Sequence, residues 1–128
     1  MGISPGLVFN QIPTTEQWNG YFIQKLDDLI PVFAEPGTGA TLESGIEQGG
    51  WILKPPGEIA TLIVIAPPGT FDRQRFVIST TQTIDDLNVT AAGGGDAIEG
   101  GAVGVLAAQG VVAWIFRLED HTWYRWTG

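Results

Sequence analysis

The β character of this chain of 128 residues is clearest in residues 111–126, which read VVAWIFRLEDHTWYRW. Residues 111–116 are almost continuously apolar, and this pattern is typical of a central strand that is buried on both faces. Glu119 and Asp120 then form a turn signal, and aromatic side chains dominate residues 122–126. The segment therefore predicts a buried strand that is followed by a second, aromatic-rich strand.

Short apolar runs of the same kind extend back to Gly49, separated by turn signals rich in glycine and proline. Asp85 and Asp86 interrupt one of these runs, which predicts a bulge or a turn there. We see no fixed-period repeat of the kind that marks a solenoid. The spacing of the runs predicts a mainly β chain, a single antiparallel β-sandwich or jelly-roll-like barrel. The expected strands cover residues 51–54, 59–66, 75–80, 82–90, 97–99, 103–107, 111–118 and 122–126.

The chain before Gly49 has a different character. Residues 1–13 read as an extended arm, and a short α-helix is expected to follow, with Thr14 as its N-cap and Pro31 as its stop. An apolar stripe marks one face of this helix, because its members recur at helical spacing. The stripe consists of Trp18, Phe22, Leu26 and Leu29. We thus expect an arm and amphipathic helix for attachment or oligomerisation (1–30), a connector rich in proline and glycine (31–48) and a β domain (49–128).

The composition excludes several kinds of partner. The net charge is −8, and the six basic residues are scattered, so we expect no binding to nucleic acid or to an anionic membrane. Charged residues make up 16% of the chain, and it contains five tryptophans. Few charges and many aromatic rings are typical of a domain that hides part of its surface in an assembly, although a dense β core has the same composition.

No residue pattern indicates catalysis. His121 is the one histidine, and a triad with Asp120 and either Ser44 or Ser79 lacks any nucleophile motif. The chain has no cysteine, so a thiolate metal site is excluded. The carboxylates with most potential as cation ligands do not follow a known ligand spacing; they are Asp85, Asp86, Asp96 and Glu99. We therefore expect no enzyme activity, no catalytic or metal-binding residues and no cofactor.

The aromatic residues of the C-terminal half allow two interpretations. Trp114, Trp123 and Trp126 have the chemistry of a platform on which sugar rings stack. Tryptophan suits a hydrophobic core and a protein interface equally well, and we favour that second interpretation.

Two segments resemble structural proteins of tailed bacteriophages. Residues 11–27, QIPTTEQWNGYFIQKLD, resemble a segment with the pattern LPTxxQWNxxFxxKxD near the start of many virion proteins, with Ile12 in place of leucine. Residues from about Gly69 to Trp126 resemble small β modules of phage fibres, spikes and capsid decorations. The matching stretches are residues 73–78, 80–91 and 122–126.

The resemblance implies a non-enzymatic structural protein of the virion, assembled in the host cytoplasm and expected to form a homotrimer. Its expected partners are other virion proteins, either the major capsid protein or tail proteins. Because the chain has room for one domain, we expect a capsid decoration or cement protein, or a short head fibre, that binds and stabilises the outside of the shell. The alternative is a tail-fibre or tailspike component that binds a glycan on the host surface.

In the first of these readings the arm and the helix face contact the capsid or a sister subunit. The residues expected at this contact are Leu7, Val8, Phe9, Trp18, Tyr21, Phe22 and Leu26. The sequence leaves open whether the helix packs on its own chain or on a neighbouring one.

Overall fold

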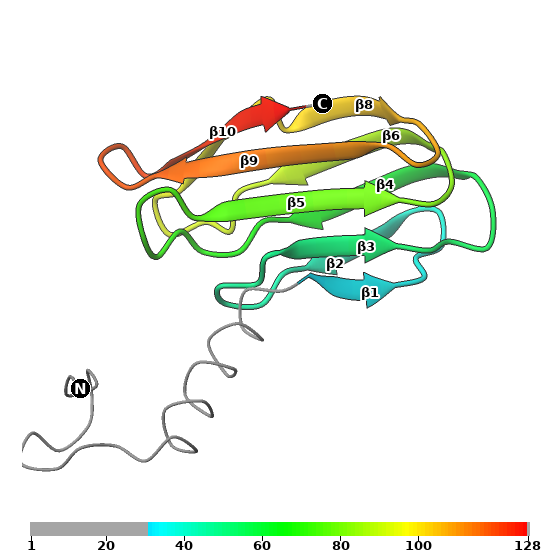
Figure 1. The fold of residues 1–128 in the computed structure, drawn as a ribbon, viewed down its shortest axis with the longest axis horizontal. Coiled ribbons are helices and arrows are strands. Elements are labelled where there is room, and N and C mark those ends of the chain that lie inside the picture. Colours follow the sequence, from blue (N-terminus) through cyan, green and yellow to red (C-terminus); the bar gives the residue numbers. More distant parts are fainter. Residues whose placement is uncertain (1–30, 128) are drawn as a thin grey trace, which may run out of the picture.

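A computed structural model describes residues 31–127 of the chain, and these residues form ten strands in two sheets (Figure 1). Sheet A has the strand order β1-β3-β5-β9-β10-β7, and sheet B has the order β2-β4-β6-β8. None of the described residues forms a helix that is long and apolar enough to span a membrane. The strands are β1 (Val32–Ala34), β2 (Ala40–Glu43), β3 (Gly50–Leu53), β4 (Ile59–Ile65), β5 (Arg75–Thr80), β6 (Ile84–Thr90), β7 (Ala97–Glu99), β8 (Ala102–Leu106), β9 (Val111–Arg117) and β10 (Thr122–Thr127).

The first six strands wind as a β-solenoid of about three turns. Each successive strand crosses to the opposite sheet, so β1, β3 and β5 lie side by side in sheet A while β2, β4 and β6 do so in sheet B (Figure 1). All pairings among these strands are parallel. Every turn of the chain thus adds one strand to each sheet, and the core lies between the two sheets.

The expected antiparallel sandwich or jelly-roll-like barrel is therefore wrong, and the described residues contain no helix. The solenoid escaped detection because its turns have unequal lengths. Val32 pairs with Trp51, 19 positions later, whereas Trp51 pairs with Ile78, 27 positions later. Turns that differ this much leave no fixed period in the sequence.

Antiparallel strands complete the solenoid at its C-terminal end. In sheet B, β8 pairs antiparallel with β6, and in sheet A, β9 pairs antiparallel with β5. Strand β10 folds back on β9, and the short β7 joins the outer edge of β10 in parallel. The antiparallel expectation thus holds for this end of the molecule alone.

The eight expected strands all exist, and their ends lie within two residues of the predicted ends. Strand β9 is a central strand of sheet A, as predicted, but the expected burial of both its faces is wrong, because Val111 on its outer side is 47% exposed. The predicted irregularity at Asp85 and Asp86 is confirmed, because the register between β6 and β8 shifts there. Strands β1 and β2 were not expected, since they are short and lie among the glycines and prolines of residues 31–48.

Residues 31–48 form the first turn of the solenoid rather than a separate connector. Their strands pair with β3 and β4, and a buried hydrogen bond ties the end of β2 to sheet A. In this bond Trp51 Nε1 donates to Ser44 Oγ at 2.9 Å. Both residues are 8% exposed, so the bond lies inside the packed part of the molecule.

Aromatic rings fill the wider end of the core. Phe76, Trp114, Phe116 and Trp123 are all fully buried, and neighbouring ring centroids lie 5.1–6.3 Å apart at tilted or edge-on angles. Such arrangements are the favourable ones for aromatic pairs. Gly69 lies against this cluster so closely that a Cβ atom on it would come within 2.1 Å of the Phe116 ring. The position therefore requires glycine for steric reasons.

Candidate functional site

The residues predicted to contact the capsid or a sister subunit lie outside the described part of the chain, so their role stays a prediction. They are Leu7, Val8, Phe9, Trp18, Tyr21, Phe22 and Leu26, and the predicted helix lies with them. The described chain begins at Pro31, directly after this segment.

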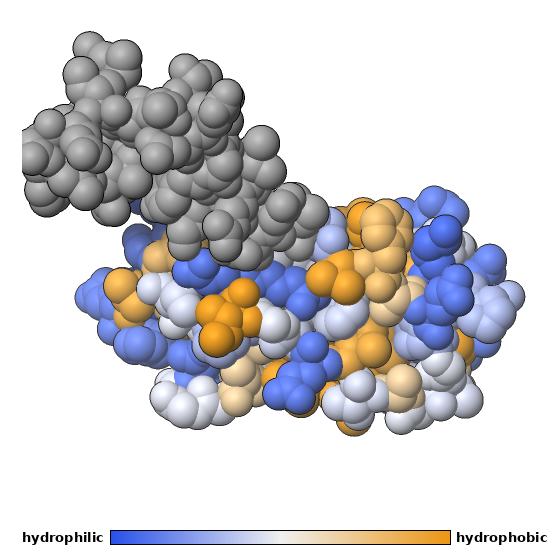
Figure 2. All heavy atoms as spheres, turned by 90° about the horizontal axis from the view of Figure 1, so that it is seen from below, coloured by the Kyte–Doolittle hydropathy of each residue, from blue (hydrophilic) through white to orange (hydrophobic). Residues whose placement is uncertain are grey.

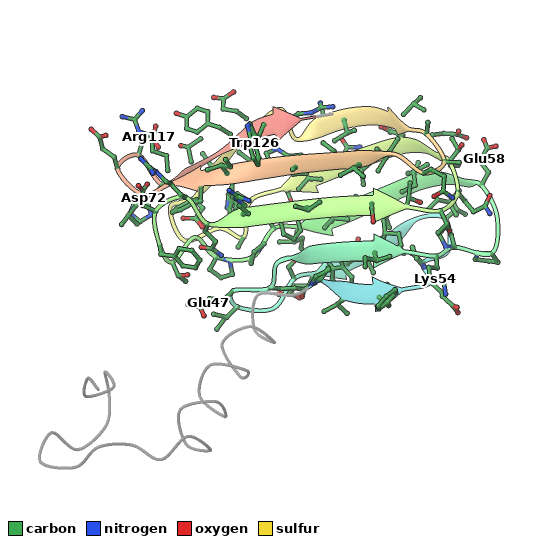
Figure 3. The ribbon with its side chains drawn as sticks, viewed as in Figure 1. Glu47, Lys54, Glu58, Asp72, Arg117 and Trp126 are labelled. Atoms are coloured by element: carbon green, nitrogen blue, oxygen red, sulfur yellow. The ribbon has the colours of Figure 1, made fainter. Side chains whose placement is uncertain are left out.

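The three tryptophans considered for glycan stacking occupy different environments. Trp114 and Trp123 are 0% exposed and belong to the core, so neither ring is available to a sugar. Trp126 is 60% exposed and lies on the outer side of sheet A, with the Arg75 guanidinium 5.2 Å from its ring centroid (Figure 3). A platform of these three rings is therefore absent, and of the three tryptophans only Trp126 presents its ring to solvent.

His121 does not belong to a catalytic triad in the described residues. Its Nδ1 lies 3.4 Å from Oδ1 of Asp96, and the second oxygen of Asp96 accepts a hydrogen bond from the Gly69 amide. Ser79 pairs with Val111 at the start of β9, whereas His121 lies beyond the end of that strand, about 20 Å away by strand geometry. Ser44 is engaged with Trp51.

The carboxylates considered as cation ligands are dispersed. Among residues 31–127 there is no group of three or more histidine or carboxylate side chains that could hold a metal ion. Asp86 accepts a hydrogen bond from Asn88, and Asp85 lies beside Glu58. This neighbour raises the pKa of Glu58 through a shared hydrogen bond and through like-charge repulsion.

The clearest feature of the surface is the outer side of sheet A, which we call the A face. It presents exposed or half-buried apolar side chains from five strands, with Phe33 66% and Trp126 60% exposed. These side chains point away from the core because their strand neighbours, such as Phe76 and Trp114, point into it. The apolar members of the A face are Phe33, Ile52, Val77, Val111, Ile115 and Trp126.

The A face also carries arginines, two of which have carboxylate partners: Arg117 lies 2.6 Å from Glu119 and 3.8 Å from Asp120, and Arg73 lies 3.9 Å from Asp72. The outward positions of β5 and β9 carry Arg75 and Arg117 but no Asp or Glu. Arg73, which is 89% exposed, lies beside them in a shallow hollow. Pro31, the first described residue, lines the same hollow.

The outer side of sheet B, the B face, differs from the A face. Its exposed positions on β2, β4 and β6 are mostly polar, and they include Thr41, Glu43, Thr61 and Asp86. Ile63, which is 42% exposed, and Val105 on β8, which is 64% exposed, are apolar exceptions on this face. Between the two faces, the end of the solenoid formed by the first turn mixes hydrophobic and hydrophilic side chains (Figure 2).

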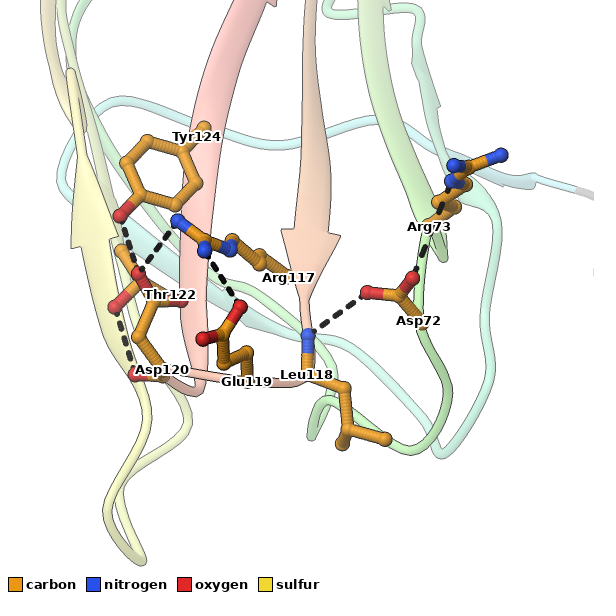
Figure 4. Close-up of polar contacts among 8 residues, drawn as sticks. All are labelled: Asp72, Arg73, Arg117, Leu118, Glu119, Asp120, Thr122 and Tyr124. Atoms are coloured by element: carbon orange, nitrogen blue, oxygen red, sulfur yellow. Dashed lines mark hydrogen bonds and ion pairs between the residues drawn. The ribbon is translucent and has the colours of Figure 1, made fainter.

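A polar network lies at one end of the A face, around the turn between β9 and β10 (Figure 4). Arg117 contacts Glu119 at 2.6 Å and Asp120 at 3.8 Å, and Tyr124 donates a hydrogen bond to Asp120 at 2.5 Å. Asp72 accepts a hydrogen bond from the Leu118 amide. The bond to Glu119 raises the pKa of Arg117, and the bond to Asp120 raises the pKa of Tyr124. The network fixes the turn between β9 and β10 and holds Arg117 in place.

The A face has the character of a binding surface. An apolar sheet face with the exposed Arg73 and Arg75 side chains at its edge favours a partner that is apolar and carries acidic groups. Part of the A face is visible in the sequence, since Arg73, Arg75 and Val77 alternate in one strand region. The neighbouring side chains from β1, β3 and β9 depend on the solenoid winding. No family model, curated protein or solved structure matches this chain.

Proposed function

We propose that this chain is a structural protein of a bacteriophage virion, and specifically a capsid decoration or cement protein. The observation that carries the proposal is the difference between the two faces of the solenoid. The A face presents apolar side chains from five strands, whereas the outward positions of β2, β4 and β6 on the B face are mostly polar. A decoration protein needs one surface that is buried in the assembly and another that remains in solvent.

The sequence resemblance to virion proteins supports the same proposal. In it, residues 1–30 attach the protein to the shell or to sister subunits, and the described β domain stands outward. Many copies with weak apolar contacts bind a repetitive shell firmly, because the contacts act together. The expected partners are the major capsid protein and further copies of the chain, arranged as a homotrimer.

Antibody labelling of purified virions tests the proposal. Gold-labelled antibodies against residues 31–127 should decorate the head in many copies, and mass spectrometry should find the protein in virions purified free of host material. Absence of the protein from purified virions would overturn the proposal.

A tail-fibre or tailspike component is the second candidate, and a specific observation favours it. Parallel solenoid turns are a way to build an elongated shaft, and Trp126 with Arg75 offers one ring and one cation to a sugar. In this case the gold label should lie on the tail. Host polysaccharide should then change the tryptophan fluorescence of the native protein, and the Trp126→Ala variant should lose that change.

A further inference from the structure

The A face requires an occupant, because it leaves apolar side chains from five strands in contact with water. Patches of this kind on soluble proteins mark interaction sites. The arginines of the A face bear on what that occupant is. Arg117 is already paired with Glu119 and Asp120, whereas Arg73 is 89% exposed and Arg75 lies over the Trp126 ring. Acidic groups of an occupant therefore gain most at Arg73 and Arg75.

Residues 14–30 have the complementary chemistry. The apolar stripe predicted there includes Trp18 and Phe22, and the segment carries Glu16, Asp27 and Asp28 against the single cation Lys25. A helix of this length extends over about 25 Å. The five strands from β1 to β10 span about 19 Å at the usual strand spacing, so the helix is long enough to cross the A face.

The short connection to β1 indicates that the segment bound to the A face comes from a neighbouring chain rather than from the same chain. The predicted helix stops before Pro31, and β1 begins at Val32, which leaves one residue to join them. Connections between helices and strands that pack in adjacent layers normally contain about 2–6 residues. A segment that binds to another copy is not subject to this limit on the length of the connection.

We propose that the A face binds residues 14–30 of a second copy of this chain, with Asp27 and Asp28 near Arg73 and Arg75. The proteins then assemble by exchanging their N-terminal segments. This inference rests on the proposed function only in treating residues 1–30 as a docking element, and it adds the surface to which that element binds.

Cysteine cross-linking of the full-length protein tests the exchange directly, because the natural chain has no cysteine. One tagged chain carries Phe22→Cys, and a second chain with a different tag carries Ile115→Cys. After co-expression and mild oxidation, we expect a disulfide between the two different chains. The matched control pairs Phe22→Cys with Ile63→Cys on the B face, and we expect no cross-link.

A charge exchange provides a second measurement that does not disturb the core. Arg75→Glu should weaken self-association about three- to tenfold by analytical ultracentrifugation, and Asp28→Arg should restore part of it. Lys54→Glu is the control, because Lys54 lies at the opposite end of the strands from Arg117 (Figure 3).

Three results would overturn the inference: a monomeric mass at all concentrations, a cross-link that forms equally well with Ile63→Cys, or a cross-link confined to single chains carrying both Phe22→Cys and Ile115→Cys. None of these results bears on whether the protein is found in virions. Failure of the inference is therefore distinguishable from failure of the proposed function.

Discussion

Replacement of Ser44 by alanine is the sharpest test of whether residues 31–48 form a true solenoid turn. Ser44 Oγ accepts the buried hydrogen bond from Trp51 Nε1 at 2.9 Å, and both residues are 8% exposed. The variant leaves the indole N–H buried without this acceptor, at a cost of about 1–3 kcal/mol in the free energy of unfolding. For a domain of about 100 residues this corresponds to a decrease in Tm of about 5–20 °C.

Urea and thermal unfolding followed by circular dichroism measure this effect on the full-length protein. Thr41→Ala is the matched control, because Thr41 is exposed on β2, and its effect should stay below about 0.5 kcal/mol. Ser44→Ala should also cost much less in a Trp51→Phe background, where no indole N–H remains to be left unpaired. The double-mutant cycle should then give a coupling energy of about 1 kcal/mol or more.

A Ser44→Ala variant as stable as Thr41→Ala would refute the reasoning. The hydrogen bond would then contribute nothing to folding, and residues 31–48 would behave as the connector that their composition suggested. Equal losses in the presence and absence of the Trp51 indole would contradict it as well, because the loss would then have another source.

Three further predictions address the core and two surface pairs. Gly69→Ala should lower the free energy of unfolding by about 1–3 kcal/mol in urea, because its methyl group meets the Phe116 ring, whereas Gly57→Ala, with open space around it, should change it little. Because Asp85 raises the pKa of Glu58, the two ionised carboxylates destabilise the folded state above that pKa. Asp85→Asn should therefore raise Tm near about pH 7 and lose this gain near about pH 4. An equal gain in Tm at both pH values would contradict the pairing. Asp120→Asn should lower the pKa of Tyr124 in a spectrophotometric titration, and an unchanged pKa would show that the hydrogen bond is not formed in solution.

Local structure was predictable from this sequence to a large extent. Alternating apolar residues and turn signals located eight strands, and the Asp85-Asp86 pair located the irregularity in β6. These features depend on neighbouring residues, so a local pattern contains them. Strands β1 and β2 have three and four residues, and their pairing with β3 and β4 supplies what their own sequence does not.

The solenoid winding was not predictable, because the apolar pattern of a strand does not show which other strand pairs with it. Apolar alternation is compatible with parallel and antiparallel pairing, and unequal turns hid the repeat. The A face was missed for the same reason. Phe33, Ile52 and Val111 are far apart in the sequence and share a face because β1, β3, β5 and β9 lie side by side in sheet A.

The two ends of the solenoid differ in a way that bears on how copies assemble. At the C-terminal end, β8, the edge strand of sheet B, has irregular register with β6. Such an irregularity protects a sheet edge from pairing with another chain. At the other end, β1, the edge strand of sheet A, pairs with β3 in unbroken register and exposes Val32 and Phe33. The edge at the first turn is therefore more favourable for contacts with further copies than the edge formed by β8.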